Sequence, residues 1–491
     1  MQINLNRSSP QPLYAQLALD IQRRIRSGAL PAGARLPTVR ELARQLGVTR
    51  LTVHSAYSEL QAGGWVEATV GRGTFVAPQT DPAAVLPESG RDISPPSILN
   101  DMLRMARLPG MRSLAMADAA PDLYPAREFG RAVEEALASG GPAVMSYTTS
   151  QGDPLLRTTL ADMLRERGVS AGPDEIVITS GVTQGMSLIA HTLARAGDAV
   201  IVEQPTYLGL LNILSAQGLR AVGVPVDDEG LVVDALEPLI LEHRPRFIYT
   251  IPVFQNPSGV CLSPARRAAL LALIERHRLP LVEDDIYNQL VYEGEAPPAI
   301  KAGDQSGLVL TIGSFSKSAL PGARVGYIAA APHLVGRLVA AKQADDLCSP
   351  PLLQRALALF VQHGWLAAHL KRVNPRYRER RDALLTAMAR HFPSGLRWSS
   401  PRGGFCTWVA LPPGASTADL YLAAMERGVA FAPGDVFFAG PPPQPYLRLS
   451  FSSLPPELIG EAVQILGQVI SGHLTRRSFT PPPLADCVPL I

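Results

Sequence analysis

Most of this chain alternates between short apolar runs and longer segments with helical periodicity, and this rhythm limits its fold more than any other feature of the sequence. The alternation covers the chain from residue 112 onward, and several of the intervening segments are rich in Ala and Leu. We predict strands at residues 175–179, 199–202, 247–250, 279–282, 308–312 and 325–329. Strands that alternate with helices are typical of a largely parallel sheet wrapped by helices, with the ligand at the carboxyl ends of the strands.

The length and composition of the chain exclude several classes of protein. With 491 residues the chain is too long for one ordinary core, so we expect two or more domains. Hydrophobic residues make up 46% and charged residues 18%, which excludes intrinsic disorder. No apolar run reaches the roughly 20 residues of a membrane span, and the first residues lack a secretion signal, so we expect a cytoplasmic protein. The widely spaced cysteines predict reduced thiols and no zinc site; they are Cys261, Cys348, Cys406 and Cys487.

The formal charge of +2 conceals a difference between the two ends of the chain. Residues 1–77 carry nine arginines and four acidic residues, a net charge of +5, whereas the remainder carries −3. A basic head on a slightly acidic body predicts a polyanionic partner for the head alone.

The basic head has the pattern of a helix-turn-helix. Apolar residues recur at helical spacing over residues 13–27, which predicts a first helix. Thr38 and Glu41 have the spacing of a capping box, which predicts a second helix over 39–46. A tight turn follows, and Thr49 can cap a third helix. Three helices at this spacing are typical of a helix-turn-helix.

The third predicted helix carries Arg50, Thr52 and His54 near its N-terminus, on the side away from its apolar stripe. A recognition helix meets base edges and phosphates with residues in this place. Two short strands are predicted within residues 65–76, joined by a Gly-Arg-Gly tip that contains Arg72, and this hairpin is typical of a wing. A helical protein-interaction module with a solvated basic face is the alternative. The order of the elements favours DNA binding.

Residues 11–77 closely resemble the winged helix-turn-helix of the GntR family of bacterial regulators. The likeness includes the sequence SGALPAGARLPTVRELARQLGVTRLTVHSAY and the closing GRGTFV. It implies that the residues in contact with DNA are Arg40, Thr49, Arg50, Thr52 and Arg72. His54 stands where many relatives have arginine, and we keep it as a further candidate contact. The resemblance thus predicts an α+β DNA-binding domain over residues 1–77.

A linker is predicted between this head and the body. Residues 78–110 are rich in Pro, Ala, Ser and Asp, and most of them lack helical periodicity. This composition predicts a semi-extended linker that lets the heads move relative to the body. The body is predicted over residues 111–472. Residues 473–491 contain three consecutive prolines and are predicted to be an irregular tail.

One stretch of the body, SFSKSALPGAR, follows the predicted strand at 308–312 and centres on Lys317. The chain uses arginine for most of its positive charge, and its lysines are Lys301, Lys317, Lys342 and Lys371. An amine that loses its proton can attack a carbonyl group, whereas a guanidinium stays protonated. Taken alone, Lys317 is more simply interpreted as a solvated loop residue. Residues elsewhere in the body favour the chemical role.

Polar and aromatic residues follow several other predicted strands. The amides of Val182 and Thr183 open a helix after a strand and can hold a phosphate, although plain helix entry is the alternative. Tyr207 can stack on an aromatic ligand or pack against the core. Asn256 offers a side-chain amide, or simply forms an Asn-Pro turn.

Three acidic residues end the predicted strand at 279–282, and such a cluster is costly to bury unless something cationic meets it. Asp284 can meet a pyridinium nitrogen, and Tyr287 can donate to a phenolate oxygen. Ser314 and Arg324 can close a phosphate cup beside Lys317. Together these residues predict a site for pyridoxal 5'-phosphate.

At this point the body resembles the fold type I aminotransferases, and head and body together resemble the MocR group of the GntR family, from about residue 11 to 472. The matching segments are SYTTSQGDPLLRTTLADML, TSGVTQG, VFQNPSG, EDDIYNQL, SFSKSALPGARVGY and PYLRLSF. The resemblance implies that Lys317 forms an imine with the cofactor and that Asp284 pairs with its ring nitrogen. The other implied roles are ring-oxygen contacts by Asn256 and Tyr287, stacking by Tyr207, and phosphate contacts by Val182, Thr183, Ser314 and Arg324.

Two further roles follow from the same resemblance. Tyr147 is implied to reach the phosphate of a neighbouring subunit, which predicts a homodimer. Arg448 matches an arginine that grips a substrate α-carboxylate through two parallel hydrogen bonds. A surface arginine on a strand is the alternative for Arg448.

Three functions are compatible with this sequence. The first is a transcription regulator whose aminotransferase-like domain binds pyridoxal phosphate and an amino-compound effector, with the effector changing the pose of two tethered heads. The second is a working aminotransferase with an accessory DNA-binding head. The third is a DNA-binding dimer whose body is only a scaffold. The patterned recognition helix argues against the second, and the set of cofactor-binding residues argues against the third.

Overall fold

The computed structural model describes residues 13–26, 29–31, 33–62, 65–69, 73–76 and 110–476. The chain divides into two compact units, Met1–Asp92 and Ile93–Ile491. Arg72 and nearly all of the predicted linker lie outside the described residues.

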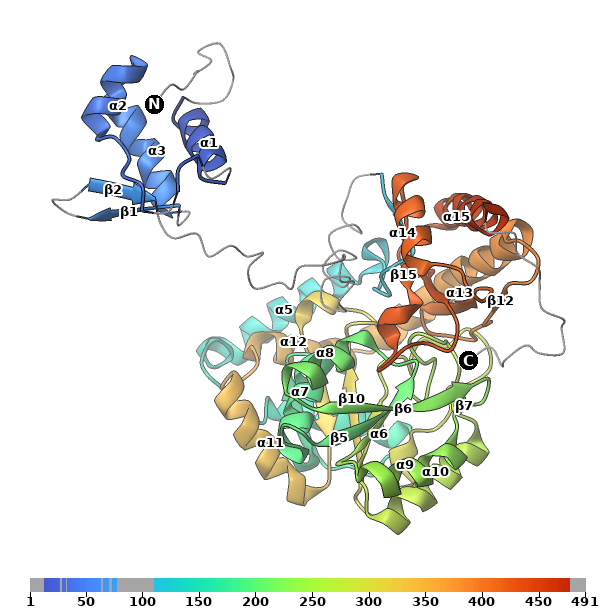
Figure 1. Ribbon diagram of the computed structural model, residues 1–491. Helices are drawn as coiled ribbons and strands as arrows, with labels where there is room; N and C mark the ends of the chain where they lie inside the picture. The colour runs from blue at the N-terminus through green and yellow to red at the C-terminus, as the bar shows by residue number, and fades with distance from the viewer. Residues whose placement is uncertain are drawn as a thin grey trace. The chain divides into compact units, whose positions relative to one another are not determined.

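The N-terminal unit has the helices and hairpin of the predicted winged helix-turn-helix (Figure 1). Its elements are α1 (Leu13–Arg26), α2 (Val39–Leu46), α3 (Arg50–Ala62), β1 (Val66–Thr69) and β2 (Gly73–Val76). The strands β1 and β2 pair antiparallel. One small core joins them, formed by apolar residues such as Leu17, Leu42 and Leu60, which are all fully buried.

Local signals set the ends of α2 and α3. The Thr38 side chain accepts a hydrogen bond from the Glu41 amide at 3.2 Å, and the Glu41 carboxylate accepts one from the Thr38 amide at 3.0 Å, so the predicted capping box is formed. Gly47 ends α2 with a φ of 63°, a left-handed conformation that glycine adopts without strain. The Thr49 hydroxyl accepts from the Thr52 amide at 3.2 Å and caps α3.

The larger unit is built on an eight-stranded sheet with the order β4-β11-β10-β9-β8-β5-β6-β7. The strands are β4 (Ile176–Thr179), β5 (Ala199–Gln204), β6 (Arg220–Asp227), β7 (Gly230–Leu231), β8 (Ile248–Thr250), β9 (Leu281–Asp284), β10 (Val309–Ser314) and β11 (Gly326–Ala329). β11 runs antiparallel to β10 and β4, and β7 antiparallel to β6, whereas the pairs from β10 to β6 are parallel. The predicted α/β domain with a largely parallel sheet is confirmed.

Helices cover both faces of this sheet because its strands are apolar on both sides. Val177 of β4 packs in the core shared with one set of helices, and its neighbours Ile176 and Ile178 pack in the core on the opposite face. The first set is α7 (Val182–Leu193), α8 (Leu208–Ala216) and α11 (Pro332–Asp345). The second set is α5 (Ala126–Gly140), α6 (Pro154–Glu166), α9 (Leu236–His243), α10 (Pro264–His277) and α12 (Pro351–Gln362).

A second, smaller sheet lies in the C-terminal part of the larger unit, with the order β12-β13-β16-β15 (Figure 1). Its strands are β12 (Arg397–Trp398), β13 (Cys406–Ala410), β15 (Ala432–Pro433) and β16 (Tyr446–Ser450). The neighbouring elements are α13 (Trp365–His391), α14 (Thr417–Glu426), α15 (Pro456–Arg476) and the short pair of β14 (Val429–Ala430) with β3 (Arg112–Ser113). This sheet forms one wall of the candidate site through Arg448 of β16.

The structure corrects two details of the prediction. β9 begins two residues later than predicted and includes Glu283 and Asp284, so these acids are inside the strand and not beyond its end. The tail predicted to be irregular from residue 473 is helical up to Arg476, because Leu474 packs against the main core. The rest of that tail is not among the described residues.

In the described part of the chain, no helix combines the length and the apolarity that a membrane crossing requires. Three described cysteines are unpaired thiols, namely Cys261, Cys348 and Cys406, and Cys487 lies outside the described residues.

Candidate cofactor pocket and nucleic-acid interface

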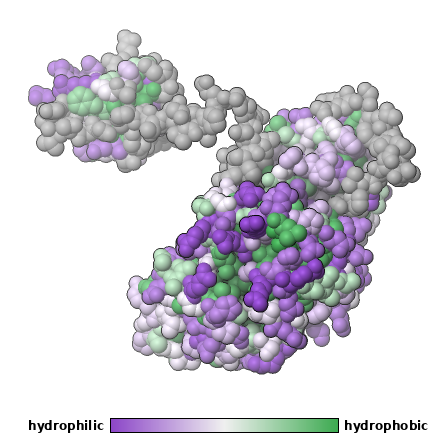
Figure 2. Space-filling view, turned by 60° about the horizontal axis from the view of Figure 1, so that its bottom comes forward, coloured by the Kyte–Doolittle hydropathy of each residue, from purple (hydrophilic) through white to green (hydrophobic). Residues whose placement is uncertain are grey.

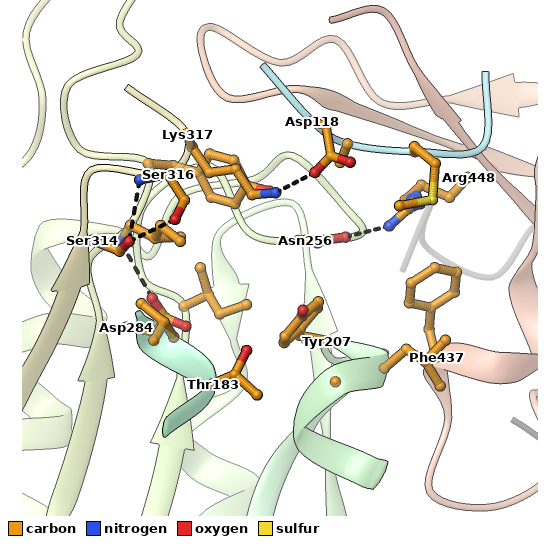
Figure 3. A pocket seen from close by; sticks show the side chains of 18 of the residues that line it. Asp118, Thr183, Tyr207, Asn256, Asp284, Ser314, Ser316, Lys317, Phe437 and Arg448 are labelled. Atoms are coloured by element: carbon orange, nitrogen blue, oxygen red, sulfur yellow. Dashed lines mark hydrogen bonds and ion pairs between the residues drawn. The ribbon is translucent and has the colours of Figure 1, made fainter. Parts of the chain in front are cut away.

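A pocket lies at the carboxyl ends of the parallel strands, between the large sheet and β16 of the small one (Figure 3). Every residue of the body that we predicted as part of the site lines it, except Tyr147. These lining residues are Val182, Thr183, Tyr207, Asn256, Asp284, Tyr287, Ser314, Lys317, Arg324 and Arg448. Residues from distant parts of the sequence thus meet in one cavity.

Lys317 lies three residues after the end of β10, and 22% of its side chain is exposed. Its Nζ donates a hydrogen bond to Oδ1 of Asp118 at 2.8 Å (Figure 3). Asp118 was not predicted from the sequence. It comes from the segment that follows β3, far from Lys317 along the chain.

Asp284 is the last residue of β9 and is almost fully buried. Its Oδ2 accepts a hydrogen bond from the Tyr249 hydroxyl at 2.6 Å, and its Oδ1 accepts one from the Ile286 amide at 3.2 Å. Burial raises the pKa of Asp284 to about 6, and the bond from Tyr249 opposes this shift. A buried carboxylate of this kind is stabilised by a cationic group brought in by a ligand.

The two acids beside Asp284 face other partners. Glu283 accepts hydrogen bonds from the amides of Ile300 and Lys301 at 2.6 and 3.1 Å. Asp285 pairs with Arg167 outside the pocket, and burial raises the pKa of Asp285 to about 7. Of the three consecutive acids, only Asp284 lines the pocket.

The end of the pocket at the N-terminus of α7 is built for an anion. α7 begins at Val182 without a side-chain cap, so the Val182 and Thr183 amides are available to a ligand. Gly181, with a φ of 92°, lies close to Arg324: a Cβ there would stand 2.8 Å from the guanidinium. Arg324 in turn donates to the Ser180 carbonyl at 3.0 Å. Helix amides and an arginine together form a phosphate cup.

Arg448 lies on β16 at the opposite wall and is buried. Its Nη1 donates to Oδ1 of Asn256 at 3.1 Å, and its Nη2 donates to the Ala115 carbonyl. The guanidinium lies 4.8 Å from the centre of the Phe437 ring. Its Nε is buried and has no hydrogen-bond partner among the described residues. A hydrogen-bond acceptor on a ligand would stabilise a buried donor of this kind.

Two tyrosines form further parts of the wall. The ring of Tyr207 occupies the space beside Gly209, where a Cβ would stand 2.4 Å from that ring, so a glycine is required there. Tyr287 is buried, and burial raises its pKa well above the usual range, so its hydroxyl keeps its proton. Tyr147, by contrast, is 85% exposed and does not line the pocket of its own chain.

These residues fit pyridoxal 5'-phosphate. The pocket offers a primary amine, a buried carboxylate for a ring nitrogen, free helix amides with an arginine for a phosphate, and aromatic side chains beside them. The raised pKa of Asp284 and the unpartnered Nε of Arg448 both mark groups that a ligand can satisfy. The individual roles of these residues stay predictions.

The candidate DNA contacts of the N-terminal unit are exposed where the sequence predicted. Arg40, Thr49, Arg50 and His54 are exposed, and Thr52 is half-buried. The opposite side of α3 is buried through Val53, Ala56, Tyr57 and Leu60. The polar side of α3 is therefore free to meet a ligand, as in a recognition helix.

Comparison with known proteins agrees with both units. The family described as aminotransferase class I and II matches residues 116–466, and that of bacterial regulatory proteins, gntR family, matches residues 13–76. The probable rhizopine catabolism regulatory protein MocR of Rhizobium meliloti is 30% identical over 94% of this chain and 94% of its own length. This chain belongs to the MocR-type regulators of the GntR family.

The larger unit of this MocR-type regulator is also similar to enzymes. Aromatic-amino-acid aminotransferase 1 of Thermococcus litoralis is 36% identical, over 77% of this chain and 93% of that protein. A solved structure of LysN, an alpha-aminoadipate aminotransferase from Thermus thermophilus complexed with N-(5'-phosphopyridoxyl)-L-leucine, has a TM-score of 0.72 and 34% identity, covering 77% of this chain and 95% of that chain. Pyridoxal phosphate is the cofactor of this family, and the protein is a DNA-binding regulator that depends on it.

Sequence reasoning missed Asp118 and Phe437, which line the pocket, and Tyr249, which holds Asp284 from behind it. Asp118 and Phe437 carried no motif and follow no predicted strand that would have marked them. Tyr249 lay on a predicted strand, and its place beside Val282 on the neighbouring strand β9 brings its hydroxyl to Asp284. The order of the strands in the sheet was the signal needed to find Tyr249.

Proposed function

We propose that this regulator binds an operator in the cytoplasm as a homodimer, and that an amino compound in its cofactor pocket changes this binding. One observation carries the proposal: Lys317, Asp284 and Arg448 line a single pocket in a chain that also has an exposed recognition helix. The first two residues suit the cofactor, and Arg448 suits a carboxylate on the effector.

Within this proposal the residues of the pocket bind different parts of the cofactor. Asp284 holds the cofactor through its ring nitrogen, and Tyr287 and Asn256 hold the ring oxygen. Val182, Thr183, Ser314 and Arg324 hold the phosphate, and the Tyr207 ring stacks on the cofactor. Bound pyridoxal phosphate supplies an aldehyde carbon that bonds to an amine and a ring that withdraws electrons.

The effector is proposed to be an amino compound with a carboxylate. Arg448 already directs one guanidinium nitrogen to Asn256 and another to the Ala115 carbonyl, so it is oriented before the ligand arrives. A carboxylate would satisfy its buried Nε. Lys317 and Arg448 line the same pocket, so the amine of Lys317 and that of the effector would both be within reach of a bound cofactor.

A second copy of the chain is proposed to complete the pocket. Tyr147 and Met145 are 85% and 72% exposed, unusual values for large side chains of this type. One face of the larger unit shows hydrophobic residues at its centre with hydrophilic residues around them, a pattern found at interfaces (Figure 2). Both observations support a dimer in which Tyr147 contacts the phosphate of the cofactor bound by the partner subunit.

The second candidate function is transamination of an amino acid or amine. It is favoured by the pocket itself, because Lys317 has the place and the chemistry of a base as well as of an imine-forming residue. DNA binding separates the two candidates, since a transaminase does not need an exposed recognition helix.

The test is footprinting on the DNA upstream of the protein's own gene. Pyridoxal phosphate and a panel of amino acids are added separately and together. We expect one segment to outcompete random duplex, and its protection to change when cofactor and one amino compound are both present. Arg448→Gln should keep the footprint and lose the response. If no segment outcompetes random duplex, the regulatory proposal is wrong.

A further inference from the structure

Lys342 is the most deeply buried of the four lysines, and no role has been assigned to it so far. It lies in the last turn of α11, and its side chain has no exposed surface. Its Nζ forms a salt bridge with Asp346, at 2.6 Å from Oδ1 and 2.8 Å from Oδ2, and donates to the Ser349 hydroxyl at 3.0 Å. A charge buried in this way is costly unless its partners lie close.

The partners of Lys342 reach the turn that precedes α7. Oδ2 of Asp346 accepts hydrogen bonds from Nε2 of Gln184 at 2.9 Å and from the Ser180 hydroxyl at 3.3 Å. Oε1 of Gln184 accepts from the Ser180 amide at 2.7 Å and lies 3.4 Å from Nζ of Lys342. The Ser349 hydroxyl lies 3.3 Å from that of Ser180. These bonds converge on Ser180.

Ser180 is the link between this network and the phosphate cup. Its amide and hydroxyl face the partners of Lys342, whereas its carbonyl accepts from Arg324 of the cup at 3.0 Å. Gly181 follows with a φ of 92°, and the uncapped N-terminus of α7 begins at Val182. The Val182 and Thr183 amides thus come directly after a turn whose polar groups are held from the side of α11.

We propose that Lys342 is a positioning residue for the phosphate of the cofactor. It fixes Ser180 through Asp346 and Gln184, and in this way orients the amides at the start of α7. Lysine suits the place because its compact ammonium group directs donors to several partners, whereas a guanidinium is larger and planar. The charge of Lys342 is offset by that of Asp346, so we attribute the effect to orientation and not to attraction of the phosphate over a distance.

The other end of the pocket has supports of its own. Asp284 is held by the Tyr249 hydroxyl and the Ile286 amide, and neither bond involves the network around Lys342. Loss of Lys342 should therefore weaken the binding of the phosphate and spare the binding of the ring. A lysine with a merely structural role would weaken both or neither.

The test compares Lys342→Met with the wild type in the full-length protein. Absorbance titrations of the cofactor-free protein measure the dissociation constants of pyridoxal 5'-phosphate and of pyridoxal, which lacks the phosphate. We expect the variant to bind pyridoxal 5'-phosphate about tenfold more weakly, the effect of losing about one well-placed hydrogen bond. Its affinity for pyridoxal should equal that of the wild type. Inorganic phosphate, added as a competitor of the cofactor, should act on the variant only at higher concentrations.

The matched control is Lys301→Met. Lys301 is also buried, and its Nζ donates to the carbonyl of Val309 at 2.7 Å. Val309 begins β10, whose other end lies at the pocket. Both variants should lower the melting temperature of the cofactor-free protein, because both remove a buried polar contact. Lys301→Met should keep the wild-type preference for pyridoxal 5'-phosphate over pyridoxal.

Gln184→Leu cuts the link to the Ser180 amide without removing a buried charge, and it replaces Lys342→Met if that variant does not fold. The inference is overturned if the variant binds pyridoxal 5'-phosphate and inorganic phosphate as the wild type does, if pyridoxal binding falls by the same factor, or if Lys301→Met shows the same selective loss. The inference rests on the cofactor and not on regulation. The wild-type titration tests cofactor binding, and the wild-type footprint tests the proposed function.

Discussion

The two units hold their functional groups in opposite ways. In the N-terminal unit the candidate DNA contacts described by the structure fall between Arg40 and His54, and nearly all are exposed. In the larger unit the pocket collects residues from Met116 to Arg448, and Asp284, Asn256 and Arg448 are buried. The exposed residues of the N-terminal unit can therefore interact with a long polyanion such as DNA. The buried residues of the larger unit can surround a small ligand.

Because of this difference, salt should affect the interactions of the two units differently. Exposed arginines interact with phosphates through screened charge, so their contribution falls as salt rises. Buried groups such as Asp284 interact at short range in a medium of low polarity, where solvent ions have little effect. Substitutions in the N-terminal unit should thus leave cofactor binding unchanged. Substitutions in the pocket should leave DNA binding in the absence of ligands unchanged.

The largest expected effect is that of Lys317→Ala. The variant should lose the absorbance band of the imine between Lys317 and the cofactor, because no other amine lines the pocket among the described residues. Its DNA binding in the absence of ligands should equal that of the wild type. Lys371→Ala removes an exposed lysine of α13 and should keep the absorbance. An unchanged spectrum in Lys317→Ala would disprove the cofactor assignment of this lysine.

The next effect concerns Asp284 and pH. Its folded-state pKa of about 6 is above the ordinary 3.8, so the folded protein holds this proton to higher pH than the unfolded chain does. The free energy of unfolding of the cofactor-free protein should therefore fall as pH rises from about 4 to 6. Asp284→Asn should remove this fall and be more stable at pH 8 by on the order of 3 kcal/mol.

Thermal unfolding of both proteins at pH 4 and pH 8 measures this difference. Pyridoxal phosphate should reverse the order at pH 8, since only the wild-type carboxylate can pair with the ring nitrogen. If the two proteins have equal stability at every pH without cofactor, then burial does not raise the pKa of Asp284 in the folded protein.

Arg50→Ala is expected to weaken operator binding by about 1 to 3 kcal/mol, the usual cost of losing an arginine contact to DNA. If the lost contact is to a phosphate, the slope of the logarithm of the binding constant against the logarithm of the salt concentration should also become shallower by about one. Fluorescence anisotropy over a range of salt concentrations measures both quantities. Arg44→Ala, in the same unit and also exposed, serves as the charge-matched control. Equal losses in the two variants would indicate general attraction and not a recognition contact.

The smallest effect is that of Thr38→Ala, which removes the cap of α2. Loss of such a cap costs about 1 kcal/mol. Hydrogen exchange of the α2 amides in the full-length protein should show this loss. Ser263→Ala removes an equivalent cap from α10 in the larger unit and should cost a similar amount. Only the first variant should weaken DNA binding in the absence of ligands, and an equal effect on DNA from both would contradict a local role of the α2 cap.

The head was predictable because its signals are local. The capping box of Thr38 and Glu41 and the left-handed Gly47 involve residues within one or two helical turns. The α/β fold class of the body was predictable because its strands are apolar on both faces. Its site residues were found through a resemblance, and through their positions after strands, which meet at one edge of a sheet.

The parts that sequence reasoning missed depend on contacts between distant residues. Asp118 and Lys317 are separated by 199 positions, and nothing local to Asp118 indicates that its carboxylate meets an amine. The bond of Tyr249 to Asp284 requires that β8 and β9 be neighbours in the sheet. The role of Tyr147, which is exposed in one chain, requires the partner subunit and stays a prediction.

In the proposed function, the pocket and the recognition helix are coupled. Coupling between two binding sites is reciprocal, so the factor by which an effector changes operator affinity must equal the factor by which the operator changes effector affinity. Both factors are measurable on the cofactor-loaded protein, by anisotropy of a labelled operator and by titration of the cofactor absorbance with the effector found in the footprinting panel. We expect the two factors to be equal and to differ from one. Operator affinity that stays the same with the pocket empty and with the pocket saturated would contradict it.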